Sequence, residues 1–176
     1  MTTELSTRVK SALRAIPDYP KQGIVFQDIT PVLQDGRLLR DVVRGMALMA
    51  AGRGVSHILG IEARGFILGA GLANELEVGF LPARKPGKLP WEKVSESYQL
   101  EYGWDALEAH RDACPPGSRI LIVDDVLATG GTAQAAGTLV RQLGGELVGW
   151  SFLLELTFLG GRAKLGGAPV DAIVAL

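Results

Sequence analysis

RILIVDDVLATGGTAQAAGTLVRQL, residues 119–143, predicts a buried strand, a glycine-containing turn and an amphipathic helix, in that order. The strand is a continuous apolar run up to residue 123, and the helix places Ala133, Ala136, Val140 and Leu143 on one face. A strand that is apolar on both faces is typical of a parallel sheet covered by helices. We therefore expect an α/β fold.

The same alternation continues on both sides of this stretch. Apolar runs predict further strands at 55–61, 78–83, 147–156 and 170–176, and a helix is predicted over 65–76. Nearer the amino terminus, apolar residues at helical spacing predict helices over 5–16 and 38–49, joined by a loop over 18–31. Strands that alternate with helices imply βαβ crossovers and a central, mostly parallel sheet flanked by helices.

One segment does not fit the alternation. KPGKLPWEKVSES, residues 85–97, holds three lysines and two prolines without any periodicity. A long charged loop inside a compact domain is typically a lid or a binding loop, and less often a disordered segment. The residues after it, 98–102, alternate as a short strand would.

Composition excludes several classes of protein. The 176 residues suffice for one domain with its own core, and 47% hydrophobic with 21% charged residues excludes wholesale disorder. A formal charge of −1 is not that of a protein that binds nucleic acid or an anionic membrane through its charge. The single cysteine, Cys114, fits a reducing compartment, and we find neither a secretory signal nor a membrane-spanning run. We expect a cytoplasmic protein.

The turn after the 119–125 strand is a candidate phosphate cradle. Its glycines let consecutive N–H groups point inward, and the following helix terminus adds partial positive charge; the residues are Ala128, Thr129, Gly130, Gly131 and Thr132. The acid pair Asp124 and Asp125 directly before it suits the vicinal hydroxyls of a ribose, directly or across a Mg²⁺ ion. The lysine of a P-loop is absent, which argues against a nucleoside triphosphatase.

IVDDVLATGGT (122–132) resembles the phosphoribosyl pyrophosphate (PRPP) motif of the type I phosphoribosyltransferase family, and its ending LATGGT is similar to that of the adenine-specific members. KQGIVFQDITPVL (21–33), EARGF (62–66), PARKPGKLP (82–90) and SYQLEYG (97–103) match the same family in the same order. The resemblance covers nearly the whole chain. It implies one phosphoribosyltransferase domain over 1–176, with residues 1–35 as a hood over the base and 85–103 as a flexible lid.

The resemblance also implies a reaction and its ligands. Adenine and PRPP would give AMP and pyrophosphate, a step of purine salvage, with Mg²⁺ bound mainly through PRPP and without dedicated protein ligands. Ribose hydroxyls would be held by Asp124 and Asp125, and the 5′-phosphate by residues 128–132. Pyrophosphate would be bound by Arg64, Arg84, Lys85 and Lys88, and adenine by Val25, Phe26, Gln27 and Val126.

Glu101 and Tyr102 resemble the lid residues that lie near the reacting atoms, where Glu101 would accept or relay the purine proton. The family forms homodimers, so a homodimer is expected. Ala128 stands where relatives that use 6-oxopurines carry an acid, which favours adenine. Gln27 stands where many relatives carry arginine; a main-chain role would survive that difference, but a charge role would not.

Several alternatives remain open. Arg64 could instead form a surface salt bridge with Glu62, and Glu101 could be an exposed strand residue. At the level of function, the alternatives are a phosphoribosyltransferase for xanthine or another base, and a PRPP-sensing regulator without turnover. The regulator would need a nucleic-acid-binding module, for which the charge gives no support.

Overall fold

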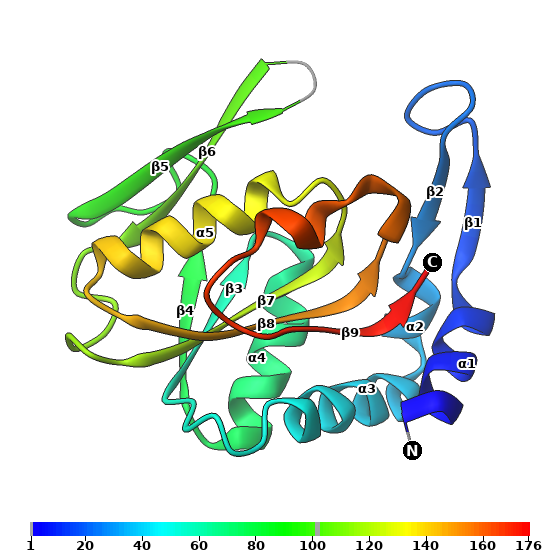
Figure 1. Ribbon diagram of the computed structural model, residues 1–176, viewed down its shortest axis with the longest axis horizontal. Helices are drawn as coiled ribbons and strands as arrows, with labels where there is room; N and C mark the ends of the chain where they lie inside the picture. The colour runs from blue at the N-terminus through cyan, green and yellow to red at the C-terminus, as the bar shows by residue number, and fades with distance from the viewer. Residues whose placement is uncertain (1, 101–102) are drawn as a thin grey trace.

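The predicted strand at 119–125 is β7 (Arg119–Leu127), the middle strand of the central sheet in this computed structural model, which describes residues 2–100 and 103–176 (Figure 1). Within those residues the sheet has five strands in the order β4-β3-β7-β8-β9, and every pairing is parallel. The other strands are β3 (His57–Ile61), β4 (Gly79–Ala83), β8 (Glu146–Glu155) and β9 (Val170–Ala175). The strand order reverses between β3 and β7. In open α/β sheets, ligands bind at such a switch point, beyond the carboxyl ends of the strands.

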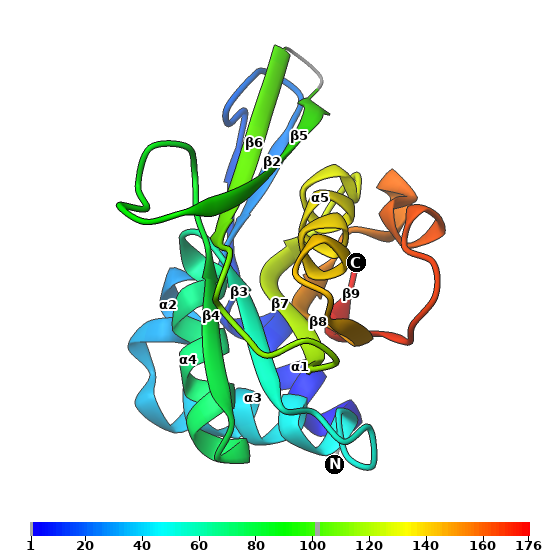
Figure 2. The same cartoon turned by 90° about the vertical axis from the view of Figure 1, so that its left-hand side faces the viewer.

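Helices cover both faces of this sheet, as predicted (Figure 2). On one face lies α5 (Gly131–Gln142); on the other lie α1 (Thr2–Ala12), α3 (Gly36–Met49) and α4 (Arg64–Leu76). Successive residues of one strand serve opposite layers: Ile122 packs in the α5 cluster, whereas Leu121 and Val123 pack in the α3–α4 cluster. The continuous apolar run in β7 is therefore explained by burial on both faces.

Two antiparallel hairpins extend from the end of the molecule at which the parallel strands finish (Figures 1 and 2). One pairs β1 (Arg14–Pro17) with β2 (Val25–Asp28), and the other pairs β5 (Lys93–Leu100) with β6 (Gly103–His110). The remaining elements are short helices: α2 (Thr30–Gln34), η1 (Thr157–Leu159) and η2 (Gly161–Lys164). Both hairpins rise beside the switch point.

Three local predictions are wrong. The first helix ends at Ala12 and not at residue 16, because Ile16 pairs with Phe26 in the β1–β2 hairpin. For the same reason the predicted loop 18–31 contains β2. The charged loop predicted over 85–97 is irregular only up to residue 92; from Lys93 the chain is β5, because Val94 and Tyr98 are buried in the α5 cluster.

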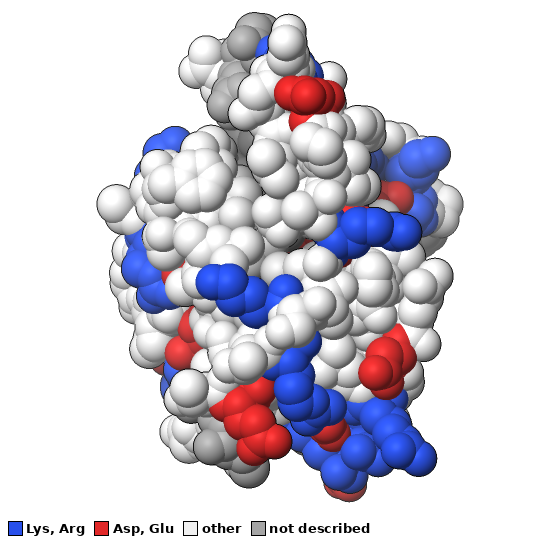
Figure 3. Space-filling model, turned by 90° about the vertical axis from the view of Figure 1, so that its right-hand side faces the viewer, with Lys and Arg blue, Asp and Glu red and all other residues white. Residues whose placement is uncertain are grey.

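On the face that carries α1 and the β1–β2 hairpin, basic and acidic side chains are interspersed (Figure 3). Among residues 2–100 and 103–176, no helix is long and apolar enough to span a bilayer.

Candidate active site

The acid pair lies at the carboxyl end of β7. Asp125 is 6% exposed, and its N–H donates a 2.8 Å hydrogen bond to Asp124 Oδ1. Burial, and then the adjacent charge of Asp125, raise the pKa of Asp124 well above its usual range. Two neighbouring carboxylates are costly to ionise here, so the site favours a ligand that brings hydroxyl donors or a cation.

The turn after β3 supplies the positive charge nearest to this pair. Arg64 begins α4, and its Nε lies 2.5 Å from Asp125 Oδ2. Gly65 permits the approach: a Cβ there would lie 2.8 Å from the Val123 carbonyl oxygen and 3.0 Å from Asp124 Oδ1. The predicted alternative, a salt bridge between Arg64 and Glu62, is wrong, because Arg64 reaches across to β7.

The candidate phosphate cradle follows β7 and opens α5. Gly130 has φ +82°, a left-handed conformation that favours glycine. No side chain among the described residues caps the amino terminus of α5, and the first helical bond runs from the Gln134 N–H to the Gly130 carbonyl. The N–H groups of the first turn therefore have no carbonyl one turn earlier, which is the usual setting for a bound phosphate.

Two cavities meet at the acid pair. The larger, about 340 Å³, is lined by the β3 turn with Arg64 and by Lys85, Asp124, Asp125 and Thr132. The smaller, about 70 Å³, is lined by Asp124 and by residues 126–133. Because Asp124 and Thr132 line both cavities, the Arg64 turn and the cradle adjoin each other at these two residues. This site stands at the switch point that the strand order defines.

Of the other predicted cations, only Lys85 lines this site. Lys85 Nζ also donates a 2.8 Å hydrogen bond to the Tyr98 hydroxyl and is ion-paired with Asp105, so it joins the site to the β5–β6 hairpin. Burial lowers the pKa of Lys85, but these hydrogen bonds outweigh it and raise the pKa above its ordinary value.

Arg84 and Lys88 lie beside the site. The Arg84 guanidinium donates two hydrogen bonds to Glu62, at 3.1 and 3.3 Å, and a third to the Lys88 carbonyl at 3.3 Å. Hydrogen bonds from Arg84 and from the Lys85 N–H lower the pKa of Glu62. The Arg84 charge is thus balanced by Glu62.

The residues predicted to contact the base lie on two elements. Val25, Phe26 and Gln27 are in β2, and the Arg64 Cζ lies 5.8 Å from the centroid of the Phe26 ring. Val126 lines the smaller cavity. Phe26 is thereby brought near Arg64, but neither cavity is lined by Val25, Phe26 or Gln27.

Glu101 and Tyr102, the predicted residues near the reacting atoms, lie outside the described residues.

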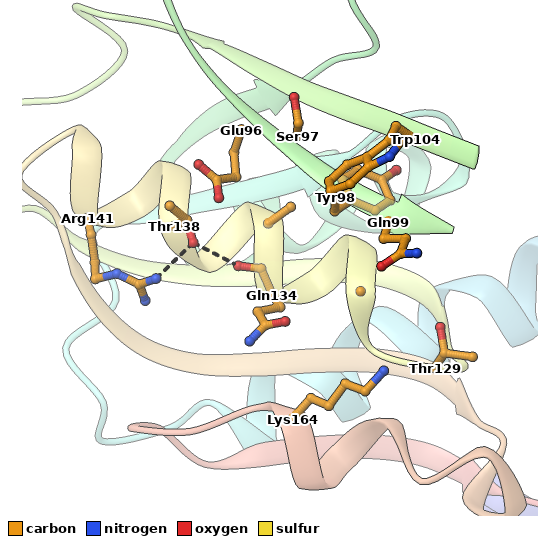
Figure 4. Close-up of a pocket in the computed structure, with 12 residues that line it drawn as sticks. Glu96, Ser97, Tyr98, Gln99, Trp104, Thr129, Gln134, Thr138, Arg141 and Lys164 are labelled. Carbon is orange, nitrogen blue, oxygen red and sulfur yellow. Dashed lines mark hydrogen bonds between the residues drawn. The ribbon is translucent and has the colours of Figure 1, made fainter. Parts of the chain in front are cut away.

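A further cavity of about 580 Å³ lies between β5 and α5 and adjoins the cradle at Thr129 and Gly131. In Figure 4, Lys164 reaches toward α5 from η2, and Trp104 lies over the opposite wall. The β5–β6 hairpin therefore stands over an open space beside the cradle.

Sequence reasoning missed three contributors to this site. Glu62 and Asp105 hold Arg84 and Lys85, and Gly161 packs against the cradle from outside. For Glu62 the signal was its position at the end of a predicted strand. Asp105 lies in β6, which was not predicted, and the glycine pair 160–161 resembled an ordinary turn.

The donor groups at the site are suited to a hard cation that is shared with a substrate. Asp124 and Asp125 offer carboxylate oxygens, and the buried Asp125 Oδ2 has Arg64 Nε at 2.5 Å as its charged neighbour, although the contact lacks hydrogen-bond geometry. In the described ranges, this site included, no group of three or more His, Cys, Asp or Glu side chains gathers closely enough to hold a metal without further ligands. One or two carboxylates plus substrate phosphates are the ligands that Mg²⁺ usually takes at such sites.

Comparison with known proteins identifies the family. Residues 33–155 match the phosphoribosyl transferase domain family. The adenine phosphoribosyltransferase of Myxococcus xanthus is 54% identical over 172 residues, which are 98% of this chain and 94% of the relative. The crystal structure of the Thermoanaerobacter pseudethanolicus enzyme superposes with a TM-score of 0.94 at 50% identity, covering 97% of this chain and 99% of that one.

The adenine phosphoribosyltransferase of Saccharomyces cerevisiae, solved in complex with an imino-altritol bisphosphate and adenine, superposes with a TM-score of 0.93 at 41% identity, covering 97% of this chain and 99% of that one. These similarities extend over the central sheet, the Arg64 turn, the acid pair and the cradle. This chain belongs to the adenine phosphoribosyltransferases, enzymes of purine salvage.

Proposed function

We propose that the chain transfers the phosphoribosyl group of PRPP to adenine at the β3–β7 switch point, releasing AMP and pyrophosphate. The observation that carries this assignment is that the two cavities adjoin each other and share Asp124 and Thr132 as lining residues. PRPP carries one anionic group at each end of its ribose. The site likewise has one anion-binding element on each side of an acid pair.

In this proposal the acid pair binds the ribose. Asp124 and Asp125 accept hydrogen bonds from the ribose hydroxyls, and the N–H groups of residues 128–132 bind the 5′-phosphate. The α5 amino terminus adds its partial positive charge to the cradle. Ribose hydroxyls suit Asp124 because a carboxyl with a raised pKa gains from any donor that stabilises its charge.

Pyrophosphate leaves from the opposite end of the site. Arg64 is the primary ligand, since its Nε faces Asp125 and its two terminal nitrogens remain to bind phosphate oxygens. Lys85 lines the same cavity, and Arg84 and Lys88 are close enough in sequence and space to join it. Cations placed where negative charge develops on the leaving group lower the barrier for its departure.

Mg²⁺ would be bound mainly through PRPP, without a dedicated protein cage. Asp124 and Asp125 would hold the ribose hydroxyls directly or across this ion. When bound, the metal would supply charge neutralisation on the leaving pyrophosphate.

Adenine is placed beneath β2. Phe26 stacks on the purine, the main chain of Val25 and Gln27 reads its edge, and Val126 packs against it from β7. This placement is supported by the position of Phe26 beside Arg64, and the choice of adenine by the yeast relative, which was solved in complex with adenine. Ala128 leaves no acid that would hold a proton on a 6-oxopurine.

The whole chain serves as one phosphoribosyltransferase domain in this proposal. Residues 1–35 form the hood over the base, and residues 85–103 form a lid that closes over PRPP. On the lid, Glu101 accepts or relays the purine proton, and Tyr102 helps to enclose the reacting atoms. The working unit is a homodimer in the cytoplasm, a compartment that suits the single buried free thiol of Cys114.

The test is a panel of bases. Purified protein is incubated with PRPP, Mg²⁺ and, separately, adenine, guanine, hypoxanthine, xanthine and uracil, and nucleotide formation is measured. We expect AMP from adenine and no comparable product from the other bases. Preferential use of xanthine or another base would replace the assignment, and PRPP binding without turnover would favour a sensor.

A further inference from the structure

Two glycines face each other behind the cradle. A Cβ on Gly130 would lie 2.7 Å from the Gly161 carbonyl oxygen and 3.2 Å from Gly161 Cα. In the reverse direction, a Cβ on Gly161 would overlap the Ala128 carbonyl oxygen and lie 2.9 Å from the Gly130 nitrogen. The backbone of Gly161 thus forms the outer wall of the cradle, in contact with both Ala128 and Gly130.

An ion pair fixes the position of that wall. Glu155, the last residue of β8, is 4% exposed and faces the Arg162 guanidinium, which donates to both of its carboxylate oxygens, with Nε to Oε1 at 2.8 Å. Arg162 Nη1 also donates a 2.6 Å hydrogen bond to the carbonyl of Val170, the first residue of β9. The residue after Gly161 is therefore tied to two strands of the central sheet.

The same strand end also reaches the base of the cradle. Glu155 is in register with Leu127, the last residue of β7, and the N–H of Leu156 donates a 2.9 Å hydrogen bond to the Leu127 carbonyl. Ala128 follows directly. The cradle is consequently held at its start by β8 and along its outer side by Gly161.

We propose that the Glu155–Arg162 pair is a positioning device for the 5′-phosphate cradle, acting through the Gly161 backbone; this inference rests on the function proposed above. Residues 128–130 belong to no helix or strand after Leu127, and Gly130 is in the left-handed region. A loop of this kind needs an external support to keep its N–H groups aligned on a ligand. Glu155 is buried whereas Arg162 is exposed, so the pair is a poor source of net stability, but the fixed fork geometry of the guanidinium is well suited to that support.

The consequence is specific to one end of the substrate. Loss of the pair lets Gly161 move away from the cradle, which weakens phosphate binding. No hydrogen bond or ion pair joins the Arg64 turn, which comes from β3 and α4, to residues 155–162 in the described part of the chain. Pyrophosphate binding should therefore be unaffected.

The experiment measures the two ends of the site separately by titration calorimetry, with ribose 5-phosphate for the cradle and Mg²⁺-pyrophosphate for the Arg64 turn. The variants are Glu155→Gln and the double variant Glu155→Gln with Arg162→Met, which leaves no unpaired buried charge and keeps the volume. The matched control is Glu146→Gln, because Glu146 begins the same strand and pairs with Arg119 at 2.6 Å.

We expect the Kd for ribose 5-phosphate to rise about 10- to 100-fold in the pair variants, since displacement of a binding group by about 1 Å has effects of this size. The Kd for Mg²⁺-pyrophosphate and the KM for adenine should stay within about twofold of wild type. Glu146→Gln should change none of these constants.

A second pair of variants tests the contact itself. Gly161→Ala places a methyl group against the Ala128 carbonyl, and we expect the same selective loss of ribose 5-phosphate binding. Gly166→Ala is the control in the same segment, because nothing lies within 4 Å of its Cβ position. A folded double variant that binds ribose 5-phosphate like wild type, or an equal loss at both ends of the site, would overturn the proposal. Failure of the proposed function would be distinct: wild-type protein would then bind neither probe and form no AMP.

Discussion

Gly65→Ala is the substitution that probes the site most directly, because Gly65 is where α4 approaches β7. The added Cβ would lie 2.8 Å from the Val123 carbonyl oxygen, and ordinary contact begins at 3.4 Å. The first turn of α4 must therefore retreat by about 0.6 Å, the difference between these two distances. Because Arg64 immediately precedes Gly65, the guanidinium retreats from Asp125 with it.

The cost in stability is modest. Overpacking of this kind costs about 1–3 kcal/mol in the free energy of unfolding, and replacement of glycine by alanine in a helix returns about 1 kcal/mol. A net loss of about 0–2 kcal/mol lowers the Tm by up to about 8 °C in a chain of this size. The cost in activity is larger, since misplacement of a binding group by about 1 Å reduces a rate by about 100-fold. A 0.6 Å retreat should lower kcat/KM for PRPP by about 10-fold or more.

The assay is steady-state AMP formation with PRPP varied at saturating adenine, together with thermal unfolding. Gly71→Ala is the control within the same helix, because its added Cβ would meet only the Val43 side chain, at 3.0 Å. We expect Gly71→Ala to keep kcat/KM within about twofold of wild type. This change is clearly smaller than the loss of about 10-fold or more expected when Arg64 is misplaced. Unchanged kcat/KM in a folded Gly65→Ala enzyme would refute the claim that this close approach positions Arg64.

Three further outcomes are expected. Asp124→Asn should raise the Tm at neutral pH while weakening PRPP binding. The pKa of Asp124 is raised in the folded state, so ionisation of this carboxyl destabilises the fold as pH rises above 3.8, and the gain in Tm should vanish in acid. A lower Tm for the variant at neutral pH would contradict this sign. Asp28→Asn should lower stability at neutral pH, because hydrogen bonds from Thr30 and Arg14 lower the pKa of Asp28 from 3.8 to about 2; in urea unfolding, the difference from wild type should disappear as pH falls between those values. Glu101→Gln should lower kcat by about 10²- to 10⁴-fold with KM little changed, and retention of more than about a tenth of kcat would remove its role as a base.

The central sheet was predictable because its strands are buried on both faces. Continuous apolar runs in β3, β7 and β8, each bounded by glycine or charge, leave few alternatives to a parallel sheet. The β5–β6 hairpin was not predictable in the same way. Val94 and Tyr98 of β5 and Leu107 of β6 face the core, and the polar residues Ser95, Glu96 and Ser97 between the first two hide the period. Helical spacing also continues past Ala12 by coincidence, so Ile16 was assigned to the wrong element.

The site residues also fall into those that a local sequence pattern predicts and those that it does not. Asp124, Asp125 and the cradle lie in one local stretch, and the order of strands brings Arg64 to them, so these residues could be found from motifs. Glu62 and Gly161 act through tertiary contacts with residues far along the chain. No local pattern encodes such a contact. Sequence therefore identified the groups proposed to touch the ligand better than the groups that hold them in place.

In the proposed function, Arg64 would link the stability of the free protein to the binding of PRPP. Asp125 is buried, and without a cation its charge beside Asp124 would be strongly unfavourable. Arg64 provides that cation through Nε alone, and the terminal nitrogens of a guanidinium can serve a second anion at the same time. Pyrophosphate binding thus need not break the pair with Asp125. A lysine at this position has a single nitrogen and could serve only one of the two anions well, so the planar fork of arginine suits a turn that lies between an acid pair and a polyanionic leaving group.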